Sequence, residues 1–407
     1  MANILIVHQN FPGQFPHIAD ALRARGDRVA AIGGETAKGR PGVDLRRWKT
    51  GRGSTPGIFP AATRAEADMI RGEAAAGAAL QRRKDGFTPD VIIGHPGWGE
   101  TLYLKEVWPD ARMILLGEML YRSHGADLNF DPEFCAPDLV RDLRVHAKNA
   151  TQVLAYAWAD RIVCPTPFQA ASFPPGLRPL IRVVHEGVDL DRATRRAGAT
   201  VKLPGGVVLD GSTPVVTFVN RTLEPLRGFH IFMRALPAFL DAVPDAQVVV
   251  IGGDGASGYG AESPGGKGWK PWLLEELGDR LDRSRVHFMG RVPHAQMIEA
   301  FSISWAHVYY TYPFVLSWSL VEAMACECLV IASDTPPVRD AMTDGEDGAL
   351  LPFFDVAALS AALIRAAREP EAFRAMRRRA RASARRYDAA AGIAGWLTIV
   401  DEMSGKG

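Results

Sequence analysis

The two halves of this chain begin with the same order of elements, and this repetition constrains the fold more than any other feature. Residues 3–7 form a short apolar run typical of a buried parallel strand, followed by a Pro-Gly loop and an amphipathic helical stretch over 15–25. A second apolar run, 28–32, ends in two glycines. From residue 215 the order restarts with a strand, a helical stretch over 229–241, and a strand over 247–251 that also ends in two glycines. Such units predict an α/β fold with two Rossmann-like domains.

The length of the chain agrees with two domains, because 407 residues exceed the size of one ordinary core. We expect an N-terminal domain over residues 1–190 and a linker over 191–212, which is rich in Gly, Ala, Thr and Arg and shows no clear period. A C-terminal domain is expected over 213–385, with a last helix over 386–407 packing back on the N-terminal domain. The polar, glycine-containing stretch 35–57 is expected to be a long excursion.

Composition excludes several classes of protein. The hydrophobic content of 47% and charged content of 23% are those of a globular protein, and the net charge of +1 gives no basis for nucleic-acid binding. The four cysteines lack zinc-type spacing, so we expect reduced thiols. No secretory signal is expected, which favours a cytoplasmic location. Asp189 and Asp191 form an Asp-x-Asp pair on a turn that we interpret as structural, and no metal is predicted.

The stretch from residue 309 to 333 carries the strongest functional pattern. It reads as a strand end, a tight polar turn, a helix opening near Ser317 to Ser319, and a buried strand. A helix N-terminus presents unpaired N–H groups and a positive dipole end, so this turn is a candidate anion site. Glu322 would lie beside it, where a carboxylate could accept a sugar hydroxyl. The alternative is structural, because Ser319 and Glu322 have the spacing of a capping box.

Two polar residues of the N-terminal half follow consecutive apolar runs. His95 comes directly after the run at 90–94, and Glu118 after the run at 113–116. The carboxyl ends of parallel strands meet at one edge of the sheet, which is where open α/β sheets bind ligands. Both are therefore candidate catalytic residues, with Glu118 orienting an acceptor or handling a proton. A hydrogen-bonded structural histidine is the alternative for His95.

Four segments in order resemble glycosyltransferase family 4. These are FVNR at 218–221 followed by Arg227-Gly228, VHFMGR at 286–291, VEAMAC at 321–326, and HEGVD at 185–189. The resemblance spans nearly the whole chain. It implies a GT-B fold, in which two facing Rossmann-like domains enclose an interdomain cleft. It also implies a retaining transfer of a sugar from a nucleotide-sugar, with the leaving phosphate accepting the proton of the acceptor.

The resemblance assigns roles to particular positions. Two arginines that leave a strand end six residues apart suit the charge of a diphosphate, although two solvated loop arginines are the alternative. Glu322 matches the family's ribose-binding glutamate, and the base is expected to pass Arg291 and Val292. The donor diphosphate is assigned to Arg221, Arg227, Ser317, Trp318 and the loop glycine Gly13.

One position departs from the family. Phe314 stands where the family has the first glutamate of its Glu-x7-Glu motif, a residue that usually touches the donor sugar. The departure keeps open a non-catalytic GT-B protein that binds nucleotide-sugar; a sugar-nucleotide epimerase is disfavoured by the arrangement of the other segments. The expected partners are a UDP- or GDP-linked sugar and a glycan, lipid-linked or small-molecule acceptor. We expect no cofactor, no nucleic acid, and at most weak peripheral membrane contact through the basic helix at 371–386.

Overall fold

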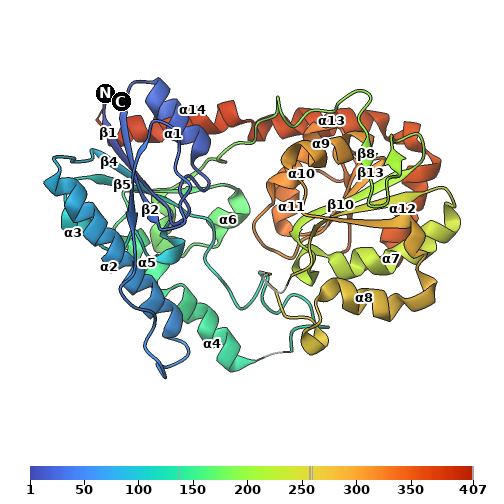
Figure 1. The fold of residues 1–407 in the computed structure, drawn as a ribbon, viewed down its shortest axis with the longest axis horizontal. Coiled ribbons are helices and arrows are strands. Elements are labelled where there is room, and N and C mark those ends of the chain that lie inside the picture. Colours follow the sequence, from blue (N-terminus) through green and yellow to red (C-terminus); the bar gives the residue numbers. More distant parts are fainter. Residues whose placement is uncertain (137, 256–257, 259, 406–407) are drawn as a thin grey trace. The chain divides into compact units, whose positions relative to one another are not determined.

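The computed structural model describes residues 1–136, 138–255, 258 and 260–405. Within them the chain forms two compact units, which Figure 1 colours along the sequence. Unit 1 comprises Met1–Leu128, Ala136–Gly187 and Ala389–Gly407. Unit 2 comprises Val188–Asp388 together with a short earlier segment, Asn129–Cys135. The sequence analysis did not anticipate that this earlier segment belongs with unit 2.

Unit 1 is built on a seven-stranded parallel sheet in the order β3-β2-β1-β4-β5-β6-β7. Its first six strands have the doubly wound order, in which the chain direction across the sheet reverses between β1 and β4. The strands are β1 (Asn3–Val7), β2 (Arg28–Gly34), β3 (Asp44–Trp48), β4 (Val91–Gly94), β5 (Arg112–Leu116), β6 (Arg161–Cys164) and β7 (Ile181–Val183). The helices are α1 (Pro16–Ala24), α2 (Thr63–Lys84), α3 (Leu104–Val107), α4 (Leu139–Lys148), α5 (Ala150–Ala157), α6 (Pro167–Ala171) and α14 (Ala389–Met403).

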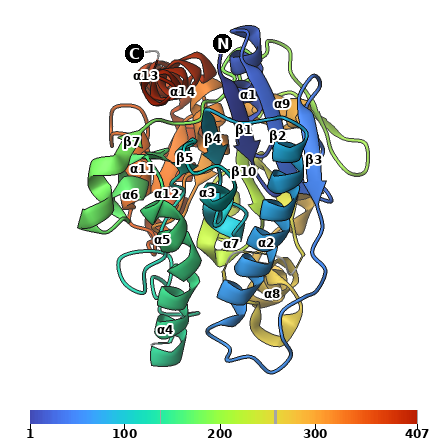
Figure 2. The ribbon, with the colours of Figure 1, turned by 90° about the vertical axis from the view of Figure 1, so that its left-hand side faces the viewer.

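Successive residues of the central strands pack alternately into two separate hydrophobic cores of unit 1. Leu5 and Val7 of β1 pack with α2 and α5, while Ile4 and Ile6 pack with α1 and with Trp396 of α14. This alternation follows from the pleat, and it explains why the strands read as continuous apolar runs. Figure 2 shows α1 and α2 beside the strands of this sheet.

Unit 2 repeats the topology with six parallel strands in the order β12-β11-β10-β13-β14-β15. The strands are β10 (Val215–Thr222), β11 (Gln247–Gly253), β12 (Val286–Gly290), β13 (Ala306–Tyr309), β14 (Val330–Ser333) and β15 (Ala349–Leu351). The helices are α7 (Phe229–Ala242), α8 (Trp269–Leu277), α9 (His294–Ile303), α10 (Trp318–Ala325), α11 (Pro336–Ala341), α12 (Val356–Arg368) and α13 (Arg374–Ala384). The reversal point lies between β10 and β13, whose carboxyl ends are the place to look for a ligand.

Two stretches differ from the sequence expectation or add to it. The stretch 35–57, expected to be a long excursion, contains a strand that the sequence analysis missed: Asp44–Trp48 forms β3 in parallel register with β2. As an edge strand with charged Arg46 and Arg47 it lacks the continuous apolar run that marked its neighbours. The expected linker carries a small antiparallel hairpin, β8 (Val201–Lys202) with β9 (Val208–Leu209).

The basic helix α13 packs its small residues inward. Ala380 and Ala384 are buried, and α13 lies against α10. Arg377 donates to the carbonyl of Trp305 and Arg386 to that of Ala341, so these two guanidinium groups hold unit 2 together. Among the described residues, no helix is long and apolar enough to cross a membrane.

Candidate functional site

A cavity of about 370 Å³ opens in unit 2 where strands β10, β11 and β12 end. It is closed on another side by the first turns of α10 and by Met297 of α9. Six of the ten residues that the sequence analysis proposed for a site line this one cavity, although they come from three different segments of the chain. They are Arg221, Arg291, Val292, Ser317, Trp318 and Glu322.

The N-terminus of α10 faces this cavity. Ser317 is the N-cap residue, and its side chain accepts a hydrogen bond from the Ser319 N–H. The Ser317 N–H in turn donates to the hydroxyl of Tyr309, 2.8 Å away. A helix start held in this way turns its positive dipole end toward the space in front of it. One wall of the cavity is therefore a helix start whose partial positive charge suits an anion.

Glu322 does not cap its own helix, so the capping-box alternative was wrong. The helix begins at Trp318, two residues earlier than a Ser319 cap requires, and the side chain that caps it is Ser317. The Glu322 carboxylate instead lies 2.6 Å from Nε2 of His294, the first residue of α9. Glu322 is only 7% exposed, and His294 is its partner at the cavity wall.

Arg227 lies apart from the cavity lining. It ends the short 3-10 helix Pro225–Arg227, is 9% exposed, and donates from Nη1 to Thr311 Oγ1 at 2.9 Å and to the Val315 carbonyl at 3.0 Å. Its guanidinium also lies 5.5 Å from the ring centre of Phe314. Arg227 thus fixes the loop between β13 and α10. Arg221, by contrast, lines the cavity itself.

A second polar group occupies the reversal point of the unit 1 sheet. His8 follows β1 and His95 follows β4, and the two rings lie edge to face with centroids 5.4 Å apart. His95 Nε2 is 3.5 Å from a carboxylate oxygen of Glu118, and His8 Nε2 is 2.6 Å from the side-chain oxygen of Gln14. Gly13 completes the group: with φ of +54°, a Cβ there would lie 2.3 Å from the His8 ring, so only glycine fits.

His8 and Glu118 of this group differ in their charge near pH 7. Burial, reinforced by the charge of His95, lowers the pKa of His8 to about 4, so His8 is a neutral imidazole near pH 7. Burial raises the pKa of Glu118, but hydrogen bonding and attraction from His95, with smaller help from His8 and Gln14, lower it overall. Glu118 is therefore a carboxylate near pH 7, in the same group as the neutral imidazole of His8.

Family models match both halves of the chain. One for the glycosyl transferase family 4 group matches residues 25–193, and one for glycosyl transferases group 1 matches residues 204–384. The chain belongs to glycosyltransferase family 4.

Curated relatives of this family 4 chain match it over part of their length. Phosphatidyl-myo-inositol mannosyltransferase of Mycolicibacterium smegmatis is 29% identical over 51% of this chain and 53% of the relative. D-inositol 3-phosphate glycosyltransferase of Mycobacterium sp. (strain KMS) is 33% identical over 43% of this chain and 37% of the relative. The chain thus spans about half or less of the length of these relatives.

Solved structures match the family 4 chain over its whole length. Sucrose-phosphate synthase of Thermosynechococcus elongatus has a TM-score of 0.72 at 17% identity and covers 100% of both chains. Anabaena HepE in complex with UDP and glucose has a TM-score of 0.66 at 15% identity, over 99% of this chain and 100% of HepE. At these identities the likeness establishes the fold, which is GT-B with two Rossmann-like domains.

Sequence reasoning missed two side chains of these groups. His8 follows the first strand just as His95 follows β4, so the strand-end rule that selected His95 would also have selected it. His294 opens α9 directly after Pro293, and no local pattern connects it to Glu322, 28 residues away. Their pairing depends on how α9 and α10 pack in unit 2, which spacing alone does not encode.

Proposed function

We propose that this chain is a retaining glycosyltransferase that moves a sugar from a nucleotide-sugar donor to a hydroxyl acceptor. The observation that carries the proposal is the unit 2 cavity, which combines Arg221, the N-terminus of α10 and the carboxylate of Glu322. A nucleoside diphosphate needs these three chemistries: positive charge and N–H groups for phosphate, and an acceptor of hydrogen bonds for ribose hydroxyls. Family 4 membership and the UDP complexes of HepE support this choice.

Departure of the nucleotide leaves two phosphates whose charge must be stabilised as the bond to the sugar breaks. The dipole of α10 is fixed before the reaction, so it would stabilise the developing charge without reorganising, and the guanidinium of Arg221 would add a full positive charge at the cavity. Glu322, held by His294, would accept from the ribose hydroxyls, and Arg291 and Val292 would flank the base. Arg227 contributes by fixing the loop that leads to Ser317.

In unit 1, the His8–His95–Glu118 group is our candidate for orienting the acceptor. The carboxylate of Glu118 can accept a hydrogen bond from a hydroxyl and turn its oxygen toward the sugar. The proton of that hydroxyl passes to the leaving phosphate oxygen, so the reaction needs no nucleophile from the protein. The names of the curated relatives place inositol-containing acceptors first in a screen.

The test is a donor screen by thermal shift followed by a transfer assay. UDP-, GDP-, ADP- and CMP-sugars are compared on the wild type, Arg221→Ala, Glu322→Gln, and the control Arg192→Ala, an exposed arginine of unit 2. Binding to the folded state raises the melting temperature by mass action. We expect one class of donor to stabilise the wild type and the control, and both site variants to lose that shift. Equal shifts in all four proteins would refute the site.

Catalysis is tested on the donor that binds. Formation of a glycoside with the donor's anomeric configuration supports the proposal. Binding with no transfer to any acceptor would instead favour the non-catalytic protein that Phe314 keeps open.

A further inference from the structure

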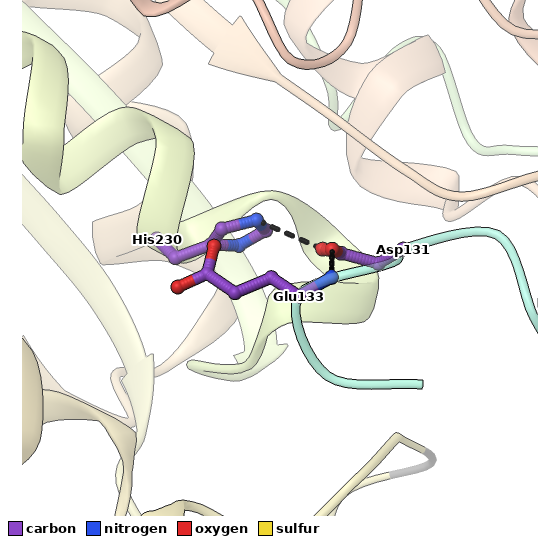
Figure 3. A group of neighbouring side chains, drawn as sticks. All are labelled: Asp131, Glu133 and His230. Atoms are coloured by element: carbon purple, nitrogen blue, oxygen red, sulfur yellow. Dashed lines mark hydrogen bonds and ion pairs between the residues drawn. The ribbon is translucent and has the colours of Figure 1, made fainter. Parts of the chain in front are cut away.

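The segment Asn129–Cys135 is a strap: the chain leaves β5 of unit 1 through Glu118, contributes these seven residues to unit 2, and returns to unit 1 before α4. The loop that carries the candidate acceptor residue Glu118 therefore continues, eleven residues later, into a segment packed on the candidate donor unit. Figure 3 shows its two acidic residues beside His230 of α7.

Two aromatic side chains anchor the strap. The Phe130 ring lies against Tyr312, Phe353 and Phe354, with centroids 4.9, 5.2 and 5.3 Å away. The Phe134 ring packs edge to face with His230 at 5.3 Å and with Trp269 at 4.7 Å. Each pair of rings at such distances adds to the stabilisation that burial alone provides. The strap is thus packed on unit 2 at both ends.

Between the anchors, Asp131 makes polar contacts that leave it 1% exposed. Its Oδ2 accepts from the Tyr312 hydroxyl at 2.6 Å and lies 3.0 Å from His230 Nε2. Its Oδ1 accepts from the Glu133 N–H at 3.0 Å. Burial opposes the charge of Asp131, but the hydrogen bonds from His230 and Tyr312 lower its pKa overall, so Asp131 is a buried carboxylate with defined donors.

Asp131, Glu133 and His230 lie close enough to hold a cation, since one ligand atom from each falls within 4.8 Å of the others. Their contacts argue against it. Both oxygens of Glu133 accept from Arg234, at 2.7 and 2.6 Å, and Asp131 already has a donor on each oxygen. A metal would have to displace N–H and O–H donors next to a guanidinium. The carboxylate oxygens that could bind a metal already accept hydrogen bonds, those of Asp131 from Tyr312 and the Glu133 N–H, and those of Glu133 from Arg234.

The strap reaches the donor cavity through Tyr312. Tyr312 belongs to the loop between β13 and α10, which ends at the N-cap Ser317, a lining residue of the cavity. Arg227 holds the same loop through Thr311 and Val315. The loop thus has two supports, one from the core of unit 2 and one from the strap.

We propose that the strap positions the loop of residues 310–317 for binding of the donor's phosphates, with Asp131 and Tyr312 as positioning residues. The inference rests on the proposed function of the cavity. It also gives a second role to the loop that follows Glu118. A movement of that loop would shift the strap, and with it the residues 310–317 that lead to the N-terminus of α10. Neither residue touches the reacting atoms; they act through Ser317 and the backbone between.

The test is Tyr312→Phe, which removes one hydroxyl and leaves the ring packing intact. Its matched control is Tyr387→Phe, which removes a hydroxyl donating to the Asp340 carbonyl in unit 2. We expect amide hydrogen exchange to rise across residues 311–319 only in Tyr312→Phe. We expect the dissociation constant for the donor's nucleoside diphosphate to rise about tenfold, a factor worth 1.4 kcal/mol, with melting temperatures of the two variants alike. Asp131→Asn, which keeps an acceptor for Tyr312, should weaken binding less.

Each other outcome is informative. Wild-type exchange and affinity in Tyr312→Phe would overturn the inference alone, provided that Arg221→Ala still weakens binding. Faster exchange without weaker binding would make the strap a structural contact only. A wild type that binds no nucleoside diphosphate would overturn the proposed function and the inference with it. Stoichiometric Zn²⁺ or Mn²⁺ binding that His230→Gln abolishes would show a metal site, and would also overturn the inference.

Discussion

Glu100 of unit 1 gives the sharpest prediction about stability. It follows the turn after β4, is fully buried, and neither carboxylate oxygen has a hydrogen-bond partner in another of the described residues. Burial raises its pKa from 4.5 to about 7, against the weaker attraction of Arg71 and His95. The change to make is Glu100→Gln, which keeps the shape and removes the titration.

The magnitude follows from linkage. Because the folded-state pKa lies above the unfolded value of 4.5, the folded chain binds the proton more tightly. The stabilisation that this provides is full below pH 4.5 and is lost as the pH rises through 7. Between pH 5 and pH 8 the free energy of unfolding of the wild type should fall by about 2.5 kcal/mol relative to Glu100→Gln. The Gln variant should thus be the more stable protein above neutrality.

Urea unfolding at pH 5, 6, 7 and 8, followed by tryptophan fluorescence, measures this difference. With two units the curve has more than one transition, and the relevant one is that of unit 1. The control is Glu106→Gln, an exposed glutamate nearby in unit 1, which should show the pH profile of the wild type. If the difference in unfolding free energy between wild type and Glu100→Gln stays constant within about 0.5 kcal/mol from pH 5 to pH 8, the pKa of Glu100 is not raised and the reasoning is refuted.

Two further substitutions test the packing. Gly228→Ala should lower the stability of unit 2 by roughly 2 kcal/mol or more, because φ is +69° and the new Cβ would lie 2.2 Å from Cβ of Tyr310. Gly265→Ala, with a similar φ of +72° and ψ of 9° but open space around it, should cost only about 1 kcal/mol in the same denaturation assay. Trp396→Ala should cost about 3–5 kcal/mol and shift the unit 1 transition only, since this fully buried ring of α14 packs in the core with β1 and α1; a shift confined to unit 2 would contradict that placement.

The sheets could be predicted from sequence because their strands are buried on both faces. Such strands read as continuous apolar runs, and the polar or glycine residues after them mark the carboxyl edge. The strand β3 was not predicted because it lies at the edge of the sheet and carries the charged residues Arg46 and Arg47, which interrupt the apolar run. The N-cap of α10 was placed to within two residues, yet whether Glu322 caps the helix depended on which serine came first.

The division of labour between Arg221 and Arg227 was beyond sequence reasoning. Six residues apart, both leave the same strand end, and spacing treats them alike. The short helix Pro225–Arg227 and the left-handed Gly228 turn the second guanidinium into the protein, where Thr311 and Val315 accept its N–H groups. Phe314, which stands where the family has a glutamate that touches the donor sugar, is also buried. Its ring packs near the Arg227 guanidinium, and the residue is 5% exposed.

The strap shows why contacts between distant segments need the structure. Its sequence, NFDPEFC, has two aromatic and two acidic residues and no strand or helix period, so nothing in it predicts a contact with a distant segment. In three dimensions Asp131 meets Tyr312, 181 residues later, and Glu133 meets Arg234, 101 residues later. A buried carboxylate is costly unless donors surround it, and here every donor comes from unit 2 or from the strap itself. The polar contacts of the buried Asp131 thus depend on unit 2, which is the physical basis for expecting the loop at residues 310–317 to respond when the strap is loosened.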